Sequence, residues 1–144
     1  MKITLLKKAE KAELKDIQEL MNQLSSDPSK HPPIKLKTLK AMAADKKTAL
    51  VVARDGTRIV GMATLGIVSN FQGFAGHIDN VVVNEEYRKQ GLGEKICKEL
   101  ITIAWKRKLE RIDLTSKPTR VAANKLYQKL GFELRETNAY TIKP

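Results

Sequence analysis

The middle third of the chain constrains the fold most, because it holds three strand-like runs separated by turn signals. Residues 48–54 and 58–69 are joined by Asp55-Gly56, where glycine tolerates the positive φ of a tight hairpin. Residues 70–76 contain two glycines and predict another turn or loop. Residues 77–83 end in three consecutive valines, a strongly β-prone run. The sequence therefore predicts a β meander.

Helices and further strands flank this meander. Before it, the spacing of apolar residues predicts a strand over 2–7 and helices over 9–24 and 36–46, which a proline-rich segment separates. After it, the pattern predicts a helix over 92–108, a strand over 111–115, a helix over 119–130 that Gly131 ends, and closing strands over 132–135 and 139–143. The order β-α-α-β-β-β-α-β-α-β-β indicates an α/β fold with a mixed sheet and helices on its faces, in one domain over 1–144.

Composition excludes several classes of protein. The chain has 144 residues, one cysteine and two histidines, so neither an internal disulfide nor a structural zinc site is expected. No apolar run is long enough for a membrane span or a signal peptide, and a cytoplasmic location is the default expectation. The net charge is +11, but the lysines are interleaved with acidic residues. This favours a solvated surface that attracts anionic ligands over a nucleic-acid-binding face.

The segment Arg88-Lys89-Gln90-Gly91-Leu92-Gly93 lies between the valine-rich strand and the following helix. A helix N-terminus presents unpaired N–H groups and a partial positive charge, which together suit phosphate oxygens. Glycine lets the backbone approach such a ligand, and two cationic side chains add charge. The segment lacks the third glycine of a dinucleotide-binding loop and the Lys-Ser/Thr of a Walker loop. Taken alone, it could equally be a plain strand-to-helix turn.

The segment 78–93 resembles the acetyl-CoA signature of the GNAT superfamily of N-acetyltransferases, whose pattern Arg88, Gly91 and Gly93 fill. A second stretch, Ala122 to Phe132, is similar to another motif of that superfamily and lies at the expected distance. The resemblance covers essentially the whole chain. It implies a GNAT-like fold, acetyl-CoA as the cofactor, and transfer of an acetyl group to a primary amine.

The resemblance also implies roles for particular residues. The valine-rich strand would contact the pantetheine arm where the sheet splays open, and the loop amides would hold the pyrophosphate. Asn124 would contact the cofactor, the N–H of Val81 would stabilise the charge on the carbonyl oxygen, and Tyr127 would protonate the leaving thiolate. Tyr127 could instead be a packing residue. The implied cofactor-binding residues are Val81, Val82, Val83, Arg88, Lys89, Gln90, Gly91, Leu92, Gly93, Glu94, Asn124 and Tyr127.

The general base is expected on the strand before the loop. Asp79 is the first candidate, because the strand resembles that of glucosamine-6-phosphate N-acetyltransferases, which carry an acidic residue there. His77 is the second, since an imidazole titrates near neutral pH. Unbroken alternation would place both side chains on the face of Val81, and a bulge near Asn80 would change that parity. Each could also be a hydrogen-bonded structural residue.

The acceptor is left open by the sequence. The segment Ser116 to Val121 departs from the sugar-phosphate enzymes, and Ser116 or Thr119 is expected to cap the following helix. Cys97 is expected to be a small core residue, and Trp105 is expected to serve packing rather than substrate contact. A small-molecule amine such as an amino acid, amino sugar or polyamine is the first expectation. A peptide N-terminus or lysine is the second, and a non-catalytic acyl-CoA-binding module the third. No metal, membrane or nucleic-acid partner is expected, and a homodimer is left open.

Overall fold

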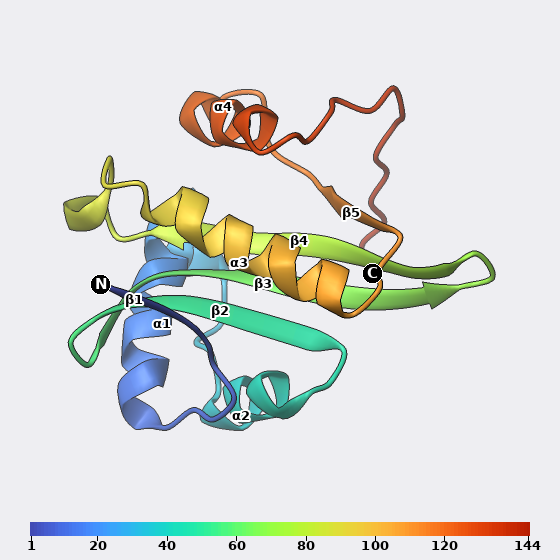
Figure 1. Cartoon of the computed structure of the whole chain (residues 1–144). Helices are drawn as coiled ribbons and strands as arrows, with labels where there is room; N and C mark the ends of the chain where they lie inside the picture. The colour runs from blue at the N-terminus through green and yellow to red at the C-terminus, as the bar shows by residue number, and fades with distance from the viewer.

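The computed structural model describes residues 1–144 and contains a five-stranded sheet with helices against both of its faces (Figure 1). The strands run in the order β1-β2-β3-β4-β5, and every pair is antiparallel except the parallel pair β4–β5. The strands are β1 (Lys2–Leu5), β2 (Thr48–Asp55), β3 (Arg58–Asn70), β4 (Gly73–Val83) and β5 (Arg111–Leu114). The helices are α1 (Lys11–Leu24), α2 (Leu36–Ala44), α3 (Leu92–Lys106) and α4 (Val121–Lys129), with short 3₁₀ turns at Pro28–Lys30 and Glu85–Tyr87.

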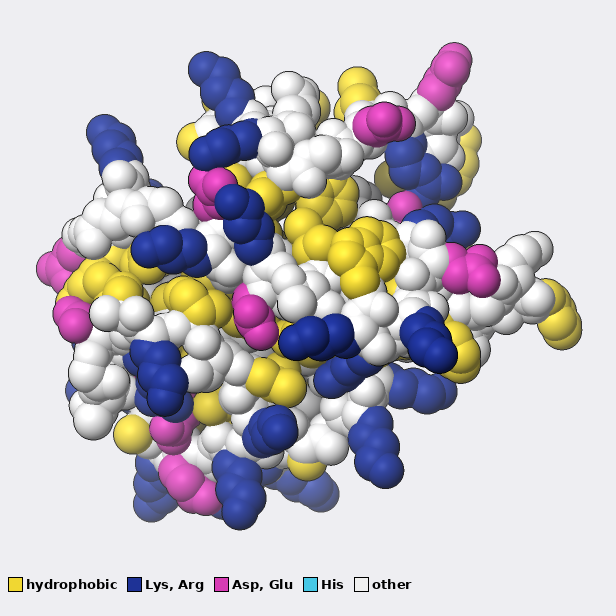
Figure 2. Space-filling view, viewed as in Figure 1, with side chains coloured by type: hydrophobic (Ala, Val, Ile, Leu, Met, Phe, Trp, Pro, Cys, Tyr) yellow, Lys and Arg dark blue, Asp and Glu magenta, His cyan; other side chains and the backbone are white.

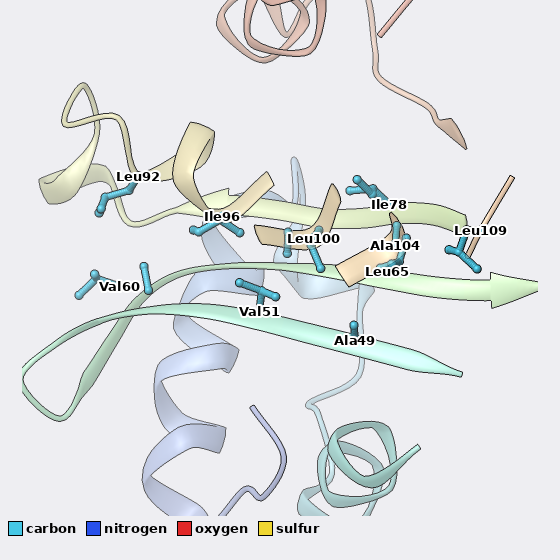
Figure 3. Packing of buried hydrophobic residues seen from close by; sticks show 12 residues of the cluster. Ala49, Val51, Val60, Leu65, Ile78, Leu92, Ile96, Leu100, Ala104 and Leu109 are labelled. Carbon is cyan, nitrogen blue, oxygen red and sulfur yellow. The ribbon is translucent and has the colours of Figure 1, made fainter. Parts of the chain in front are cut away.

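Two apolar clusters, one on each face, hold the sheet between its helices. The cluster on the α3 face combines residues four apart on the helix, such as Ile96 and Leu100, with Val51, Leu65 and Ile78 of the sheet (Figure 3). The other cluster packs Ile17 and Leu20 of α1 and Leu39 of α2 against β2 and β3. This arrangement confirms the predicted α/β class and the amphipathic stripe of α3.

The turns between strands agree only in part with the sequence analysis. Gly56 adopts a φ of +57° after Asp55, as a tight hairpin requires. The turn or loop predicted over 70–76 is present but shorter than predicted, because Asn70 pairs with Gly73 and only two residues connect β3 to β4. The side chain of Asn70 accepts a hydrogen bond of 2.9 Å from the Gln72 N–H. This local bond closes the turn and lets both strands continue to it.

The two closing strands predicted over 132–135 and 139–143 are also wrong, because residues 132–144 form no strand. Phe132 packs against the larger cluster, but Leu134 and Ile142 are almost fully exposed and cover no face of the sheet. Charged residues such as Glu133, Arg135 and Glu136 interrupt the run, so pairing with β5 would bury little apolar surface. The edge of β5 beyond β4 is consequently unpaired, while α4 and the tail lie on the far side of α3 from α1 and α2 (Figure 1).

A bulge interrupts the pairing of β3 with β4. Met62 pairs with Val82 and Thr64 pairs with Asp79, so Ala63 alone lies opposite both Asn80 and Val81. Asn80 has a φ of +55°, a left-handed conformation that is uncommon for residues other than glycine. The bulge that the sequence analysis left open is therefore present. No helix of the chain combines the length and apolar character needed to cross a membrane.

Candidate active site

A run of unpaired backbone amides lies where β4 leads into α3. The first bond of α3 joins the Lys95 N–H to the Gly91 carbonyl at 3.1 Å. The six preceding amides, from Lys89 to Glu94, donate to no protein group. Lys89 and Gly91 have φ values of +62° and +73°. Left-handed residues within such a turn make concave sets of N–H groups that suit anions, and the positive end of the α3 dipole adds to the attraction.

The side chains around these amides leave them accessible. The Nε of Arg88 donates to the Val83 carbonyl at 3.1 Å and fixes the loop to the end of β4. A Cβ at Gly91 would meet no atom within 4 Å, so the space above this residue is open. A Cβ at Gly93 would lie 3.3 Å from Leu126 Cδ2, so α3 packs closely against α4 at Gly93. Position 91 therefore favours glycine because of its positive φ, whereas position 93 favours glycine because of its contact with α4.

The open edge of β4 continues from this loop. The ladder between β4 and β5 ends where Ile78 pairs with Leu114, whereas β4 runs on to Val83. The Asn84 N–H donates to the Val60 carbonyl of β3 at 2.9 Å. Because amides alternate along a strand, Val81 and Val83 direct theirs away from β3, towards the gap where β5 has diverged. Val82 instead has a buried side chain in the cluster with α1 and a backbone directed towards β3.

The bulge inverts the faces of β4. Ile78 packs in the cluster with α3, whereas Val82, an even number of residues later, packs in the cluster with α1. His77 and Asp79 therefore lie on the opposite face from Val81 and Val83, and the alternative with unbroken alternation is wrong. The Nε2 of His77 lies 3.6 Å from Oδ1 of Asp79. The structure thus brings the two candidate bases together.

Tyr127 is the one buried side chain after residue 110. Its ring packs edge-on against Phe132, with 6.1 Å between the centroids, and its hydroxyl bonds to no protein group. Burial raises the pKa of Tyr127, the neighbouring Cys97 adds to this shift, and the Arg120 cation opposes it. The phenol is therefore protonated at neutral pH and free to donate. Burial also raises the pKa of Cys97 to about 11, as expected of a core thiol rather than a nucleophile.

A cavity of about 930 Å³ lies between β5, α4 and the tail. Its lining residues include His77, Trp105, Asn124 and Tyr127. Figure 2 shows hydrophobic side chains at the bottom of the hollow below α4. Trp105 is 53% exposed there, so it lies in the cavity wall rather than in the core. The sequence missed this exposure because Trp105 lies one position beyond the buried stripe, where periodicity alone does not separate a cavity wall from a core.

The end of β5 supplies a polar group that sequence reasoning assigned elsewhere. Ser116 and Thr119 do not cap α4, whose N-cap residue Arg120 makes no side-chain cap bond. The hydroxyl oxygen of Ser116 is buried without a partner and lines the same cavity. Asn124 donates from Nδ2 to the Lys117 carbonyl at 3.0 Å and shapes this turn. A buried hydroxyl without a partner costs free energy unless a ligand pairs with it.

One ion pair connects α3 to α4 across the site. Glu94 lies 2.6 Å from Lys129 of α4 and 2.8 Å from Lys98 of its own helix. The bond to Lys129, followed by that to Lys98, lowers the pKa of Glu94 to about 2. The other Lys and Arg side chains on this face are spread rather than gathered (Figure 2). No three His, Cys, Asp or Glu side chains lie close enough together to hold a metal ion.

Comparison with known proteins agrees with this geometry. The sequence profile of the acetyltransferase (GNAT) family matches residues 14–132. A glucosamine 6-phosphate N-acetyltransferase from Trypanosoma brucei brucei is 31% identical over 139 residues, covering 91% of this chain and 90% of that protein. The chain belongs to the acetyltransferase (GNAT) family.

Further GNAT relatives extend the comparison. An uncharacterized N-acetyltransferase, YobR of Bacillus subtilis, is 35% identical over 82 residues, which are 57% of this chain and 33% of that protein. The match thus spans about a third of the length of YobR. A putative acetyltransferase from Agrobacterium tumefaciens shares the fold with a TM-score of 0.82 and 24% identity over the full length of both chains. Members of the GNAT family use acetyl-CoA as co-substrate, so the chain is a GNAT N-acetyltransferase.

Proposed function

We propose that this GNAT enzyme transfers the acetyl group of acetyl-CoA to the primary amine of a small molecule, with amino sugars as the first class to test. The observation that carries the proposal is the run of six unpaired amides beside the open edge of β4. The relative from Trypanosoma brucei brucei, similar over almost its whole length, supports the sugar class, because its name specifies glucosamine 6-phosphate. Amino acids and polyamines are the other members of the proposed substrate class.

The residues present fit acetyl-CoA at this place. The amides from Lys89 to Glu94 would bind the pyrophosphate, with the cations of Arg88 and Lys89 adding long-range attraction. The open edge of β4 offers Val81 and Val83 backbone groups to the amides of the pantetheine arm. Ser116 and Asn124 would contact the cofactor from the opposite side of the gap. Bound there, acetyl-CoA supplies an acetyl group activated as a thioester.

The chain's own groups would then divide the chemistry between two faces of the sheet. The Val81 N–H would donate to the carbonyl oxygen as negative charge develops there. Tyr127 would give its proton to the departing thiolate. Asp79, directly or through water, would accept the proton of the attacking amine, with His77 as the second candidate. Because the bulge turns Asp79 and His77 away from Val81, the amine would arrive from the face opposite to α3.

A substrate panel tests the proposal directly. Release of free thiol from acetyl-CoA would be followed with glucosamine 6-phosphate, glucosamine, free amino acids, spermidine and short peptides, and products identified by mass spectrometry. We expect turnover with a small amine, and acetyl-CoA affinity that falls as salt is added. Turnover with peptides alone would replace the small-molecule proposal by a peptide acetyltransferase. Absence of acetyl-CoA binding at low salt would overturn the proposed site.

A further inference from the structure

The direction of the Val81 amide depends on a single extra residue in β4. If the pairing of Thr64 with Asp79 continued regularly, Val81 would lie opposite Met62 and its amide would take the direction of the Asp79 amide. The inserted residue Asn80 places Val82 opposite Met62 instead. The Val81 amide is thereby released from β3 and directed into the gap beside β5.

This extra residue is held in a conformation that needs support. Asn80 has a φ of +55°, which costs an L-residue free energy relative to ordinary strand geometry. Without compensation, the strand could slip by one residue and return the Val81 amide to β3. Asparagine is among the residues that tolerate the left-handed region, because its short side chain can hydrogen-bond locally.

A buried hydroxyl provides that local bond. The Thr64 Oγ1 lies 3.1 Å from the Asp79 carbonyl oxygen and 3.1 Å from Oδ1 of Asn80, so its one proton can be donated to either acceptor. Thr64 is 8% exposed and is one of the few buried polar residues of the chain. Both acceptors flank the peptide bond at which the bulge begins. The Thr64 hydroxyl is screened from water and lies between these two acceptors, so its hydrogen bond connects β3 to the bulge.

We propose that Thr64 and Asn80 are positioning residues that hold the bulge and thereby aim the Val81 N–H at the acetyl carbonyl. The inference rests on the proposed function, because it requires the Val81 amide to be the donor. Neither side chain need touch the reacting atoms. The effect of Thr64 passes through its hydroxyl, and the effect of Asn80 passes through the side-chain oxygen that accepts from this hydroxyl and so supports the positive φ.

Spectroscopy of bound acetyl-CoA tests this inference without an identified acceptor. Acetyl-CoA labelled with ¹³C at the acetyl carbonyl would be bound to the full chain, and the carbonyl stretching band compared with that in solution. A hydrogen bond from Val81 lowers the frequency of this band. Thr64→Val keeps the side-chain shape but removes the hydroxyl, and Asn80→Gly keeps a residue suited to positive φ but removes the acceptor. Thr64→Ser retains the hydroxyl and serves as the conservative rescue.

The expected result separates the inference from a general loss of structure. Thr64→Val and Asn80→Gly should return the band towards its solution position, while Thr64→Ser should keep it shifted. The preference for acetyl-CoA over CoA, which lacks the acetyl carbonyl, should fall by about two- to tenfold in the first two variants, because one hydrogen bond is lost. CoA affinity itself should stay constant, which shows that the phosphate loop is intact.

Three results would overturn the inference, and each has a different meaning. A shifted band in all variants would show that the bulge needs neither Thr64 nor Asn80, while the proposed function would stand. A solution-like band in the wild type, or no binding of acetyl-CoA at all, would remove the Val81 donor and with it the proposed chemistry. A variant that lost CoA affinity and the band shift together would also count against a positioning role.

Discussion

The two sides of the site, the β4–α3 junction and the segment 115–144, are held in place by different amounts of core. The junction continues directly from strands and a helix whose side chains, such as Ile78, Ile96 and Leu100, are buried in the larger cluster. After β5, only Tyr127 is buried, and Leu134 is 97% exposed. A few contacts attach α4: the Tyr127–Phe132 packing, the approach of Leu126 to Gly93, and the pair of Glu94 with Lys129.

This difference shows how one sheet with its helices can combine a well-packed and a lightly attached side of a site. The amides proposed to bind phosphate belong to the backbone, so their positions follow from the sheet and α3. The proposed proton donor, Tyr127, is a side chain on a nine-residue helix that depends on its neighbours for orientation. Cofactor binding and acid catalysis should therefore respond to different substitutions, and the four predictions below test that separation.

The largest effect is expected from Tyr127→Phe. Only the hydroxyl is lost, so the packing on Phe132 should remain and acetyl-CoA affinity should change little. The chemical step should slow by about 10²–10⁴-fold if Tyr127 is the general acid. Single-turnover kinetics with the acceptor found in the panel would measure this, because product release can mask chemistry in steady-state rates. Tyr140→Phe, at a residue 88% exposed in the tail, is the matched control. Equal rates for wild type and Tyr127→Phe would remove the acid role.

The next effect concerns stability. Leu100→Ala opens a cavity under α3, where Leu100 has no exposed surface, and should lower the free energy of unfolding by about 2–5 kcal/mol. Leu134→Ala makes the same chemical change in the exposed tail and should alter it by less than about 0.5 kcal/mol. Urea denaturation followed by circular dichroism measures both. Similar values for the two variants would mean that the tail contributes to the core as much as α3 does.

A smaller effect should follow from Gly91→Val. The φ of +73° disfavours a β-branched residue, although the space around Gly91 is open. We expect acetyl-CoA affinity to fall by about tenfold or more as the amides lose their alignment, with far-ultraviolet circular dichroism unchanged. Gly56→Val introduces the same residue at a φ of +57° with equally open space, in the distant β2–β3 hairpin. Isothermal titration should show normal affinity for this control, and equal losses in both variants would implicate general strain.

The smallest effect concerns the ion pair between Glu94 of α3 and Lys129 of α4, which joins the two sides of the site. Since the folded-state pKa of Glu94 is lowered from 4.5 to about 2, its contribution to stability is fully present above pH 4.5 and is lost as the pH falls towards 2. Lys129→Met removes the nearer partner and should lower the melting temperature slightly at pH 6 but not below pH 2. Lys125→Met, on the same helix, is the control. A difference that persists below pH 2 would show that Lys129 acts through packing.

Local sequence was sufficient for most elements and for the place of the loop that we propose to bind phosphate. Short-range preferences place Gly56 in its hairpin and Gly131, with a φ of +91°, at the end of α4. The apolar spacing of α3 likewise needs no knowledge of the rest of the chain. The loop could be located because its proposed function uses backbone groups, and glycines next to a helix start reveal where such groups are exposed.

Partners distant in sequence decided the rest. The bulge at Asn80 depends on Thr64, sixteen residues earlier on the neighbouring strand. A strand pattern cannot reveal it, because alternation fixes faces only while the register is regular. The prediction of closing strands over 132–135 and 139–143 was wrong for a similar reason. A β-prone run forms a strand only where a partner edge and a buried face are both available. The sequence alone thus determined which residues could bind phosphate. Tertiary pairing decided which face of β4 carries Asp79 and where the Val81 amide is directed. It also decided where Tyr127 lies beside the gap. Each of these depends on contacts between separate elements.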